Sequence, residues 1–376
     1  MPTEIAGQPT PYYIYHKEIL EQTLAALQSA AGDFRVHYAV KANDNPAVLR
    51  LISAHGLGAD CVSGGEISKA VENGFQADRL VFAGVGKRDD EIKLAINTGI
   101  YSLNVESEEE IKVINEIALA MGKVAPVAIR VNPDIDAHTH EKITTGTEEN
   151  KFGIPKENVV AVAKSISQMP GLKFRGLQFH IGSQITEYTC FELLCRAANS
   201  LYDTLAKEGI KCEMIDMGGG LGVDYDNPTT NPIPDFAGYF STFRRCLKLP
   251  AEVGVHFELG RSVVAQCGDL ITTVVFTKQT PHGKKFAIVD AGFTDLIRPA
   301  LYGAYHAISN ISNPAPATER YDVVGPICES SDVFAKSRPL PPTHRGDRLA
   351  IHSAGAYGEV MASTYNARPL IRGFLV

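Results

Sequence analysis

The chain has 376 residues, of which 44% are hydrophobic and 21% are charged. This is the composition of a soluble globular protein, and the length suits about two domains. The formal net charge of −7 argues against a surface that binds nucleic acid or anionic membranes. No stretch reaches the roughly 18 apolar residues of a membrane span, and the N-terminus lacks a signal-peptide pattern. The seven cysteines include no Cys-x-x-Cys pair, so we expect a cytoplasmic protein without disulfides or a zinc ribbon.

The first predicted element is TPYYIYH (10–16), which is aromatic and β-prone and is expected to add a strand to a β domain. Strand-like and helix-like segments then alternate. Eight of the segments are hydrophobic runs typical of buried parallel strands, at 35–42, 56–63, 79–86, 99–106, 125–132, 174–182, 212–220 and 254–261.

Helical patterns separate these runs. In one of them Ser107 and Glu110 are spaced as a capping box, and Gly122 is placed to end the helix. Eight strand–helix units within roughly 230 residues predict an α/β protein with a (β/α)8 barrel. A doubly wound sheet is the alternative, but it gives no reason for eight units.

The pattern changes after about residue 263, where long helical patterns nearly disappear. Short β-like runs at 268–280, 284–293, 320–330 and 346–358 are separated by Gly, Pro and Asn turns. They predict a C-terminal antiparallel β domain. We therefore expect a barrel over residues 28–263 and a β domain formed by 1–27 and 264–376.

The C-terminal ends of the predicted barrel strands carry an unusual set of polar groups. Catalytic residues of such barrels lie at these ends. A single lysine, histidine or glycine run there is more often a solvated strand end or a turn, so the indication lies in the whole set. The set comprises Lys41, Asp60, Asn132, His180 with Ser183, Gly218 to Gly222, and Glu258 with Gly260 and Arg261.

The glycine run does not match a dinucleotide fingerprint, because Val223 stands at a glycine position and no helical pattern follows directly. Its backbone N–H groups can still bind a single phosphate. A lysine amine, a phosphate loop, a histidine and a carboxylate together suit pyridoxal phosphate. In that interpretation Lys41 bonds the cofactor, Glu258 keeps the ring nitrogen protonated and His180 lies against the ring.

Joint motifs along almost the whole chain are more specific than any single residue. The chain resembles the diaminopimelate decarboxylases, which are fold type III pyridoxal-phosphate enzymes with a barrel and a β domain. The motifs that carry the resemblance are HYAVKAN (37–43), GADCVSGGEI (58–67), HIGSQ (180–184), GGGLG (218–222), ELGRS (258–262), RPALYGAYH (298–306), GPICESSD (325–332) and AGAYGEVMASTYN (354–366).

The resemblance implies a role for each matching residue. Lys41 is then the lysine that bonds the cofactor, and Cys328 is the catalytic proton donor, reaching in from the other subunit of a homodimer. Further cofactor contacts are Asp60, His180, Ser183, Gly219, Gly220, Glu258, Gly260, Arg261 and Tyr357; substrate contacts are Arg261, Arg298, Tyr302, Glu329 and Tyr357. One departure is Leu259, where the family usually has proline.

The implied reaction is decarboxylation of meso-2,6-diaminopimelate to L-lysine and CO2, the last step of lysine biosynthesis. A decarboxylase of ornithine, arginine or a carboxylated polyamine is the nearest alternative. Glu258 argues against an amino-acid racemase, whose family places arginine at the ring nitrogen, and the presence of Lys41 with Cys328 argues against an inactive binding protein.

His138 and His140 have a loose metal-like spacing without a third ligand nearby, so no metal is expected. The resemblance suggests a loop over the site at 134–147.

Overall fold

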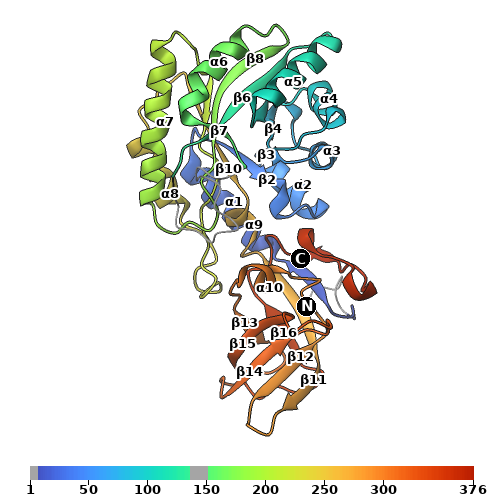
Figure 1. The fold of residues 1–376 in the computed structure, drawn as a ribbon. Helices are drawn as coiled ribbons and strands as arrows, with labels where there is room; N and C mark the ends of the chain where they lie inside the picture. The colour runs from blue at the N-terminus through green and yellow to red at the C-terminus, as the bar shows by residue number, and fades with distance from the viewer. Residues whose placement is uncertain (1–6, 136–150) are drawn as a thin grey trace. The chain divides into compact units, whose positions relative to one another are not determined.

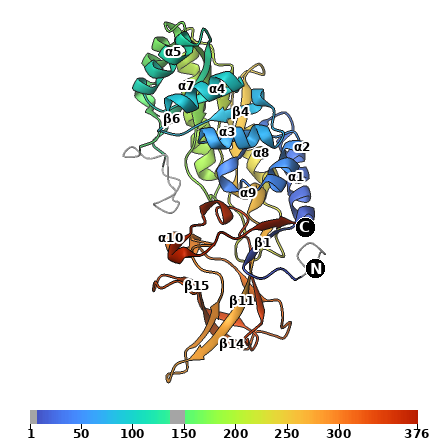
Figure 2. The same cartoon turned by 90° about the vertical axis from the view of Figure 1, so that its right-hand side faces the viewer.

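A computed structural model describes residues 7–135 and 151–376. The chain forms two compact units, and Figures 1 and 2 show it from two directions. The barrel unit comprises Leu24–Gly222 and Asp235–Gly260, and the β unit comprises Met1–Thr23, Val223–Pro234 and Arg261–Val376. The segment 223–234, which the sequence offered no reason to separate from the barrel, therefore groups with the β unit. None of the helices in the described ranges is long and apolar enough to cross a membrane.

The barrel unit contains a closed ring of parallel strands, as the sequence predicted. Every neighbouring pair is parallel, and the pairing of β5 with β6 closes the ring. The eight strands are β2 (Arg35–Ala39), β3 (Gly58–Cys61), β4 (Leu80–Phe82), β5 (Ser102–Val105), β6 (Ala125–Asn132), β8 (Leu172–Phe179), β9 (Met214–Asp216) and β10 (Gly254–Leu259). The two-residue strand β7 (Ile154–Pro155) adds a short parallel pairing to β6.

Helices connect the barrel strands and lie around the ring (Figure 1). They are α2 (Pro46–Ala54), α3 (Gly64–Glu72), α4 (Asp89–Thr98), α5 (Glu108–Ala120), α6 (Val159–Ser167), α7 (Thr189–Lys207) and α8 (Phe236–Cys246). The helix α1 (Lys17–Ala31) precedes β2. It was missing from the predicted elements, although Leu20, Leu24 and Leu27 recur at helical spacing and are buried.

Two local predictions need correction. The first predicted barrel strand (35–42) ends at Ala39 rather than at Ala42. Val40–Ala42 instead form a 3-10 turn, in which the Asn43 N–H donates to the carbonyl of Val40. The predicted capping box is only half formed. The Ser107 hydroxyl accepts from the N–H of Glu110 at 3.2 Å, but the Glu110 carboxylate accepts from the N–H of Glu106.

Side chains along β10 alternate between its two faces, and this alternation determines the direction in which Glu258 points. Phe257 faces outward against α8, where its ring lies 4.8 Å from Phe243 and 5.0 Å from Phe240, centroid to centroid. Successive side chains of a strand point to opposite faces. This aromatic cluster therefore turns the buried Glu258 toward the interior of the barrel.

The β unit is an eight-stranded sheet, mixed rather than wholly antiparallel. The pairs β12–β14 and β1–β17 are parallel, whereas the other described pairs are antiparallel. The predicted N-terminal strand is confirmed, because β1 (Tyr12–Tyr15) pairs with β11. The remaining strands are β11 (Gly268–Gln279), β12 (Lys285–Val289), β13 (Ile308–Asn310), β14 (Glu319–Val324), β15 (Val333–Leu340), β16 (Arg348–Ile351) and β17 (Gly373–Leu375), and two short helices are α9 (Arg261–Val264) and α10 (Arg298–Tyr302).

Candidate active site

Lys41 projects from the 3-10 turn that follows β2. Its amine lies 3.3 Å from Oδ2 of Asp60, at the neighbouring strand β3, and the lysine side chain is 39% exposed. The carboxylate of Asp60 is buried, and its Oδ1 has no hydrogen-bond partner among the described residues. An accessible amine beside a buried carboxylate suits a lysine that must stay in place while it reacts with a ligand.

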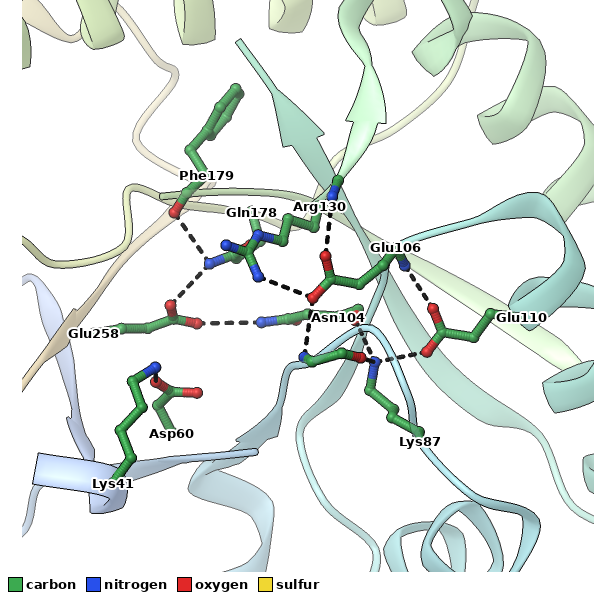
Figure 3. A network of polar contacts seen from close by, with 12 residues as sticks. Lys41, Asp60, Lys87, Asn104, Glu106, Glu110, Arg130, Gln178, Phe179 and Glu258 are labelled. Atoms are coloured by element: carbon green, nitrogen blue, oxygen red, sulfur yellow. Dashed lines mark hydrogen bonds and ion pairs between the residues drawn. The ribbon is translucent and has the colours of Figure 1, made fainter. Parts of the chain in front are cut away.

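Glu258 lies at the end of β10 and is held from two sides (Figure 3). Asn104 Nδ2 of β5 donates to its Oε1 at 3.1 Å, and Gln178 Nε2 of β8 donates to its Oε2 at 2.8 Å. Gln178 also donates to the carbonyl of Phe179 at 3.0 Å. The two amides fix the plane of the carboxyl group and leave its orientation little freedom.

Burial raises the pKa of Glu258 well above its usual range, and the nearby charges of Asp216 and Asp60 act in the same direction. The positive charges of Lys41 and Arg130 only partly offset them. A carboxyl in such a place gains from a cationic partner, because that partner removes the cost of its buried negative charge. A protonated ring nitrogen is such a partner.

Two buried ion pairs support the side of the barrel that carries Asn104 (Figure 3). Lys87 pairs with Glu110 at 2.6 Å and also donates to the carbonyl of Asn104 at 2.7 Å. Arg130 pairs with Glu106 at 2.8 Å. All four ionic side chains are nearly inaccessible to solvent, so each charge depends on its partner. The network holds the strand ends next to Glu258 in one arrangement.

The glycine loop follows β9, and close packing explains its composition. A side chain at Gly218 would collide with the carbonyl of Phe179, and one at Gly219 would collide with the carbonyl of Glu258. Gly218 and Gly220 also have φ angles of +68° and +110°, which glycine adopts readily. Gly260, at the end of β10, lies so close to the turn of Lys41 that an added Cβ would be 3.0 Å from Ala42 Cβ.

His180 follows β8, and the N–H of Gly219 donates to its Nδ1 at 3.4 Å. Burial lowers the pKa of His180 well below its usual value, with the charges of Lys41 and Arg130 adding to the effect. The ring is therefore neutral at neutral pH. Ser183 lies half-buried in the next turn of the same loop. The barrel unit thus carries Lys41, Asp60, His180, the glycine loop, Glu258 and Gly260 at the C-terminal ends of its strands, whereas the predicted cofactor contacts Arg261 and Tyr357 belong to the β unit.

The β unit holds two arginines around one tyrosine. Arg261 donates to the hydroxyl of Tyr225 at 2.8 Å, and the guanidinium of Arg298 lies 4.8 Å from the centre of the same ring. Arg298 also bonds Nε2 of His306 at 2.8 Å, while Nδ1 of that histidine donates to a backbone carbonyl. Both arginines are buried. Arg298 makes no ion pair within the described residues, and its contacts are with the neutral His306 and the ring of Tyr225.

Tyr357 lies beside Arg261, whose guanidinium is 5.0 Å from the centre of its ring. Its φ of +57° falls in the left-handed region, which is uncommon for a tyrosine. Such strain is often found where the surrounding structure must hold a side chain in a particular place. Tyr302 ends α10 and is half-buried.

The segment that contains Cys328 and Glu329 lies at the surface of the β unit. The N–H of Cys328 donates to Oδ1 of Asn366 at 3.3 Å, and the carboxylate of Glu329 accepts from the hydroxyl of Tyr365 at 2.9 Å. Cys328 is the one exposed cysteine among the seven. An exposed thiol in an ordered turn is accessible to another molecule.

Comparison with known proteins decides the family. The sequence profile of the pyridoxal-dependent decarboxylase family, pyridoxal-binding domain, matches residues 17–265. The diaminopimelate decarboxylase of Bacteroides thetaiotaomicron is 54% identical over 97% of this chain and 95% of its own length. This chain belongs to the diaminopimelate decarboxylases. The crystal structure of the Helicobacter pylori diaminopimelate decarboxylase in complex with L-lysine superposes with a TM-score of 0.93 at 38% identity, covering 99% of this chain and 93% of that one.

A more distant structure shows the same fold. The lysine/ornithine decarboxylase of Vibrio vulnificus superposes with a TM-score of 0.86 at 21% identity, over 99% of this chain and 96% of that one. The predicted family, fold class and pyridoxal phosphate cofactor of this decarboxylase are thus confirmed.

The residues of the barrel unit fit pyridoxal phosphate. Asp60 Oδ1 is a buried acceptor without a partner among the described residues, and Glu258 is a buried carboxyl that gains from a positive neighbour. Lys41 offers an amine that can bond an aldehyde, His180 offers a neutral ring, and the glycine loop offers backbone N–H groups. A donor set of this kind matches the aldehyde, ring and phosphate of that cofactor.

Several residues of this neighbourhood were not predicted from the sequence. Asn104, Gln178 and Asp216 are single polar residues in hydrophobic runs, and only the closed barrel shows that they face Glu258. Tyr225 follows the glycine loop and His306 ends the RPALYGAYH motif, so both could have been proposed from their neighbours. His138, His140 and most of the expected loop at 134–147 lie outside the described residues.

Proposed function

We propose that this decarboxylase converts meso-2,6-diaminopimelate to L-lysine and CO2, with the barrel (28–263) carrying the cofactor chemistry and the β domain the substrate and partner-site residues. The observation that carries the substrate assignment is the buried Arg298, whose guanidinium meets only neutral groups in the described part of the chain. A buried cation without an anionic partner is a ready site for the carboxylate of a ligand.

Pyridoxal phosphate, when bound, withdraws the electron pair that CO2 leaves behind. The chain's own residues prepare for this. Lys41 would hold the cofactor through its amine. Glu258 places a negative charge at the ring nitrogen and so keeps that nitrogen protonated. Asn104 and Gln178 prevent the carboxyl group of Glu258 from turning away.

His180, Asp60 and the loop residues complete the proposed cofactor contacts. A neutral His180 can lie against a ring without repelling its positive charge, which its lowered pKa supports. Asp60 can direct the Lys41 amine through their contact of 3.3 Å. The remaining proposed contacts are Ser183, Gly219, Gly220, Gly260, Arg261 and Tyr357.

The β unit supplies the proposed substrate contacts. Diaminopimelate has an amino group and a carboxylate at the end remote from the reacting carbon. Arg298 and Arg261 can each donate in a fork to a carboxylate, and Glu329 can accept from an ammonium group. Tyr302 and Tyr357 are proposed to line the same pocket. Ornithine and arginine lack the distal carboxylate and would leave Arg298 without an anion.

Cys328 is proposed to protonate the former α-carbon after CO2 departs, acting from the second subunit of a cytoplasmic homodimer. Its exposure at the surface of the β unit supports a role toward a partner chain. The seven free cysteines agree with a reducing compartment.

The test supplies meso-diaminopimelate, ornithine and arginine separately to the purified protein with pyridoxal phosphate and measures CO2 release. Release from diaminopimelate at a kcat/KM at least 30-fold above the other two is expected. Preference for ornithine or arginine would replace the proposed substrate. Release from none of the three, with cofactor bound, would contradict the decarboxylase assignment altogether.

A further inference from the structure

A second buried carboxyl group lies below Glu258 in the barrel. We propose that Asp216 holds a proton on Oδ2 and donates it to the Glu258 carboxylate, so that the two acids carry a single negative charge when Glu258 serves the ring nitrogen of the cofactor. Asp216 is then a positioning residue that sets the charge of Glu258. The inference rests on the proposed function of Glu258 and adds to it a proton-holding partner.

The hydrogen bonds of Asp216 require this proton. Its Oδ1 accepts from the N–H of Gly218 at 2.8 Å, but no N–H or O–H donor in the described ranges reaches its fully buried Oδ2. Asp216 pairs with His256 in the β9–β10 register, and Glu258 lies two residues further along β10 on the same face, so the two buried carboxyl groups are neighbours inside the barrel. Two ionised carboxylates can only accept, so a hydrogen bond between them needs one shared proton.

The surroundings assign that proton to Asp216 when the cofactor is bound. Both oxygens of Glu258 already accept from neutral amides, those of Asn104 and Gln178. Such bonds favour the ionised form of Glu258, and a cationic ring nitrogen favours it further. Asp216 accepts one backbone N–H alone. Burial raises the pKa of Asp216 to about 7, and the charge of Asp60 adds to this effect, whereas the hydrogen bonds with Gly218 and Glu258 act against it.

The next layer of the barrel also offers Asp216 an acceptor. His37 Nδ1 lies 2.9 Å from the carbonyl of Arg79, so it donates and its Nε2 must accept. His256 Nδ1, 2.9 Å from that Nε2, therefore donates, which leaves His256 Nε2 as a bare acceptor with no partner among the described residues. Polar side-chain atoms of His37, His256 and Asp216 lie within 4.8 Å of one another.

Both imidazoles are neutral, which makes this chain of donors and acceptors consistent. Burial lowers the pKa of His37 to about 4 and that of His256 well below its usual value. The side-chain neighbours of Asp216 thus include a carboxyl group and a histidine pair. A proton on Asp216 supplies a donor to this group of acceptors, whereas an ionised Asp216 would add a further acceptor.

Protons can reach this layer from solvent. His37 and His256 line a cavity of about 630 Å3 at the N-terminal end of the barrel strands, and Arg35, Arg79 and Arg175 line it too. The positive charges of the three arginines raise the electrostatic potential in this cavity. A cation bound between Asp216 and the two histidines is therefore disfavoured. The cavity gives the histidine pair beside Asp216 a route to solvent.

Charged and polar groups face the two acids from several elements, and a pH experiment must hold them constant. The groups are Lys41, Asp60, Asn104, Arg130, Gln178, Tyr239, His37 and His256. A comparison of wild type with Asp216→Asn does so, because asparagine keeps the size and a donor but does not titrate.

Calorimetry of cofactor binding provides the test. Full-length protein freed of cofactor is titrated with pyridoxal phosphate at about pH 8, in two buffers of different ionisation enthalpy, and the protons taken up are counted. On binding, Glu258, whose pKa burial raises, becomes the anion in both proteins, but only wild type has Asp216 to hold a proton. Wild type should therefore end with roughly one proton more taken up than Asp216→Asn. Asp203→Asn, on the exposed face of α7, should match wild type.

Equal proton uptake in wild type and Asp216→Asn, with cofactor bound by both, overturns the inference. Failure of wild type to bind the cofactor would instead overturn the proposed function. If Asp216→Asn does not fold or bind, infrared spectroscopy of the wild-type holoprotein with isotope-labelled aspartate decides. At about pH 8, where ordinary aspartates are ionised, the carbonyl band of a protonated aspartic acid should be present, and its absence overturns the inference.

Discussion

Replacing Arg298 by alanine should mainly destroy the preference for diaminopimelate. The guanidinium is 6% exposed, and its partners in the β unit are the Nε2 of His306 at 2.8 Å and the ring face of Tyr225. These neutral groups hold the charge in place without neutralising it. The distal carboxylate of diaminopimelate is proposed to do so.

The size of the effect follows from the burial of this charge. Removing one partner of a buried, hydrogen-bonded ion pair costs roughly 2–5 kcal/mol. At about 1.4 kcal/mol per decade, kcat/KM for diaminopimelate should fall by about 30-fold to several thousand-fold. Ornithine has no distal carboxylate, so its kcat/KM should change much less. The ratio between the two substrates should therefore fall by nearly the whole factor.

The assay measures kcat/KM of wild type, Arg298→Ala, Arg298→Lys and Arg320→Ala on both substrates. Lysine keeps the charge but loses the fork, so Arg298→Lys should be intermediate. Arg320 is an exposed arginine of the same unit, and its variant should match wild type. Thermal melting must accompany the assay, because the truncation leaves His306 without its donor, at a cost of about 1–3 kcal/mol. If Arg298→Ala is folded and keeps its full preference for diaminopimelate, Arg298 does not bind the distal carboxylate.

Three further predictions concern the cofactor and the assembly. Borohydride reduction of the purified protein followed by peptide mass analysis should find the cofactor on Lys41, and an adduct on another lysine would contradict its proposed role. Glu258→Gln should retain cofactor, detected by absorbance, but should lose at least about 100-fold in turnover, because a neutral amide cannot hold the ring nitrogen protonated; near-normal turnover would show that Glu258 is not the partner of the ring. Mixing the inactive variants Lys41→Ala and Cys328→Ala should restore activity if subunits share their sites, and no recovery despite proven chain exchange would argue against sharing.

The fold was largely predictable from local patterns. Eight Val-, Ile- and Phe-rich runs predicted the eight barrel strands, because strands buried on both faces must be hydrophobic nearly throughout. The ends of the elements were less predictable. Val40 and Ala42 continue the apolar pattern of β2, yet a backbone hydrogen bond from Asn43 turns the chain there. In the β unit, the strand β15 (VFAKSRPL) contains polar residues and a proline, so its sequence has no clear strand pattern, and pairing with β14 determines its conformation.

The candidate site likewise contains residues that the sequence predicts and residues that it does not. Lys41, His180 and Glu258 could be proposed because each stands at the end of a strand, and a barrel has its catalytic groups at that end. Tyr225 could not be paired with the arginines, since 36 residues separate it from Arg261 and no local pattern links them. Their proximity is a property of the folded β unit, where one tyrosine ring contacts two guanidinium groups.

The interior of the barrel shows why this limit matters for chemistry. Asn104, Gln178, Asp216, His256 and His37 each interrupt a hydrophobic run, and in a single strand each would be judged a defect. A closed barrel turns these positions toward one axis, and there the side chains lie together: the amides donate to Glu258, the two histidines bond each other, and the Asp216 carboxyl lies beside them. An unsatisfied polar group in such a place costs roughly 1–3 kcal/mol, so five of them would be hard for the fold to tolerate individually. They lie together on one axis of the barrel, and their proposed common role is to determine the charge that Glu258 presents to the cofactor.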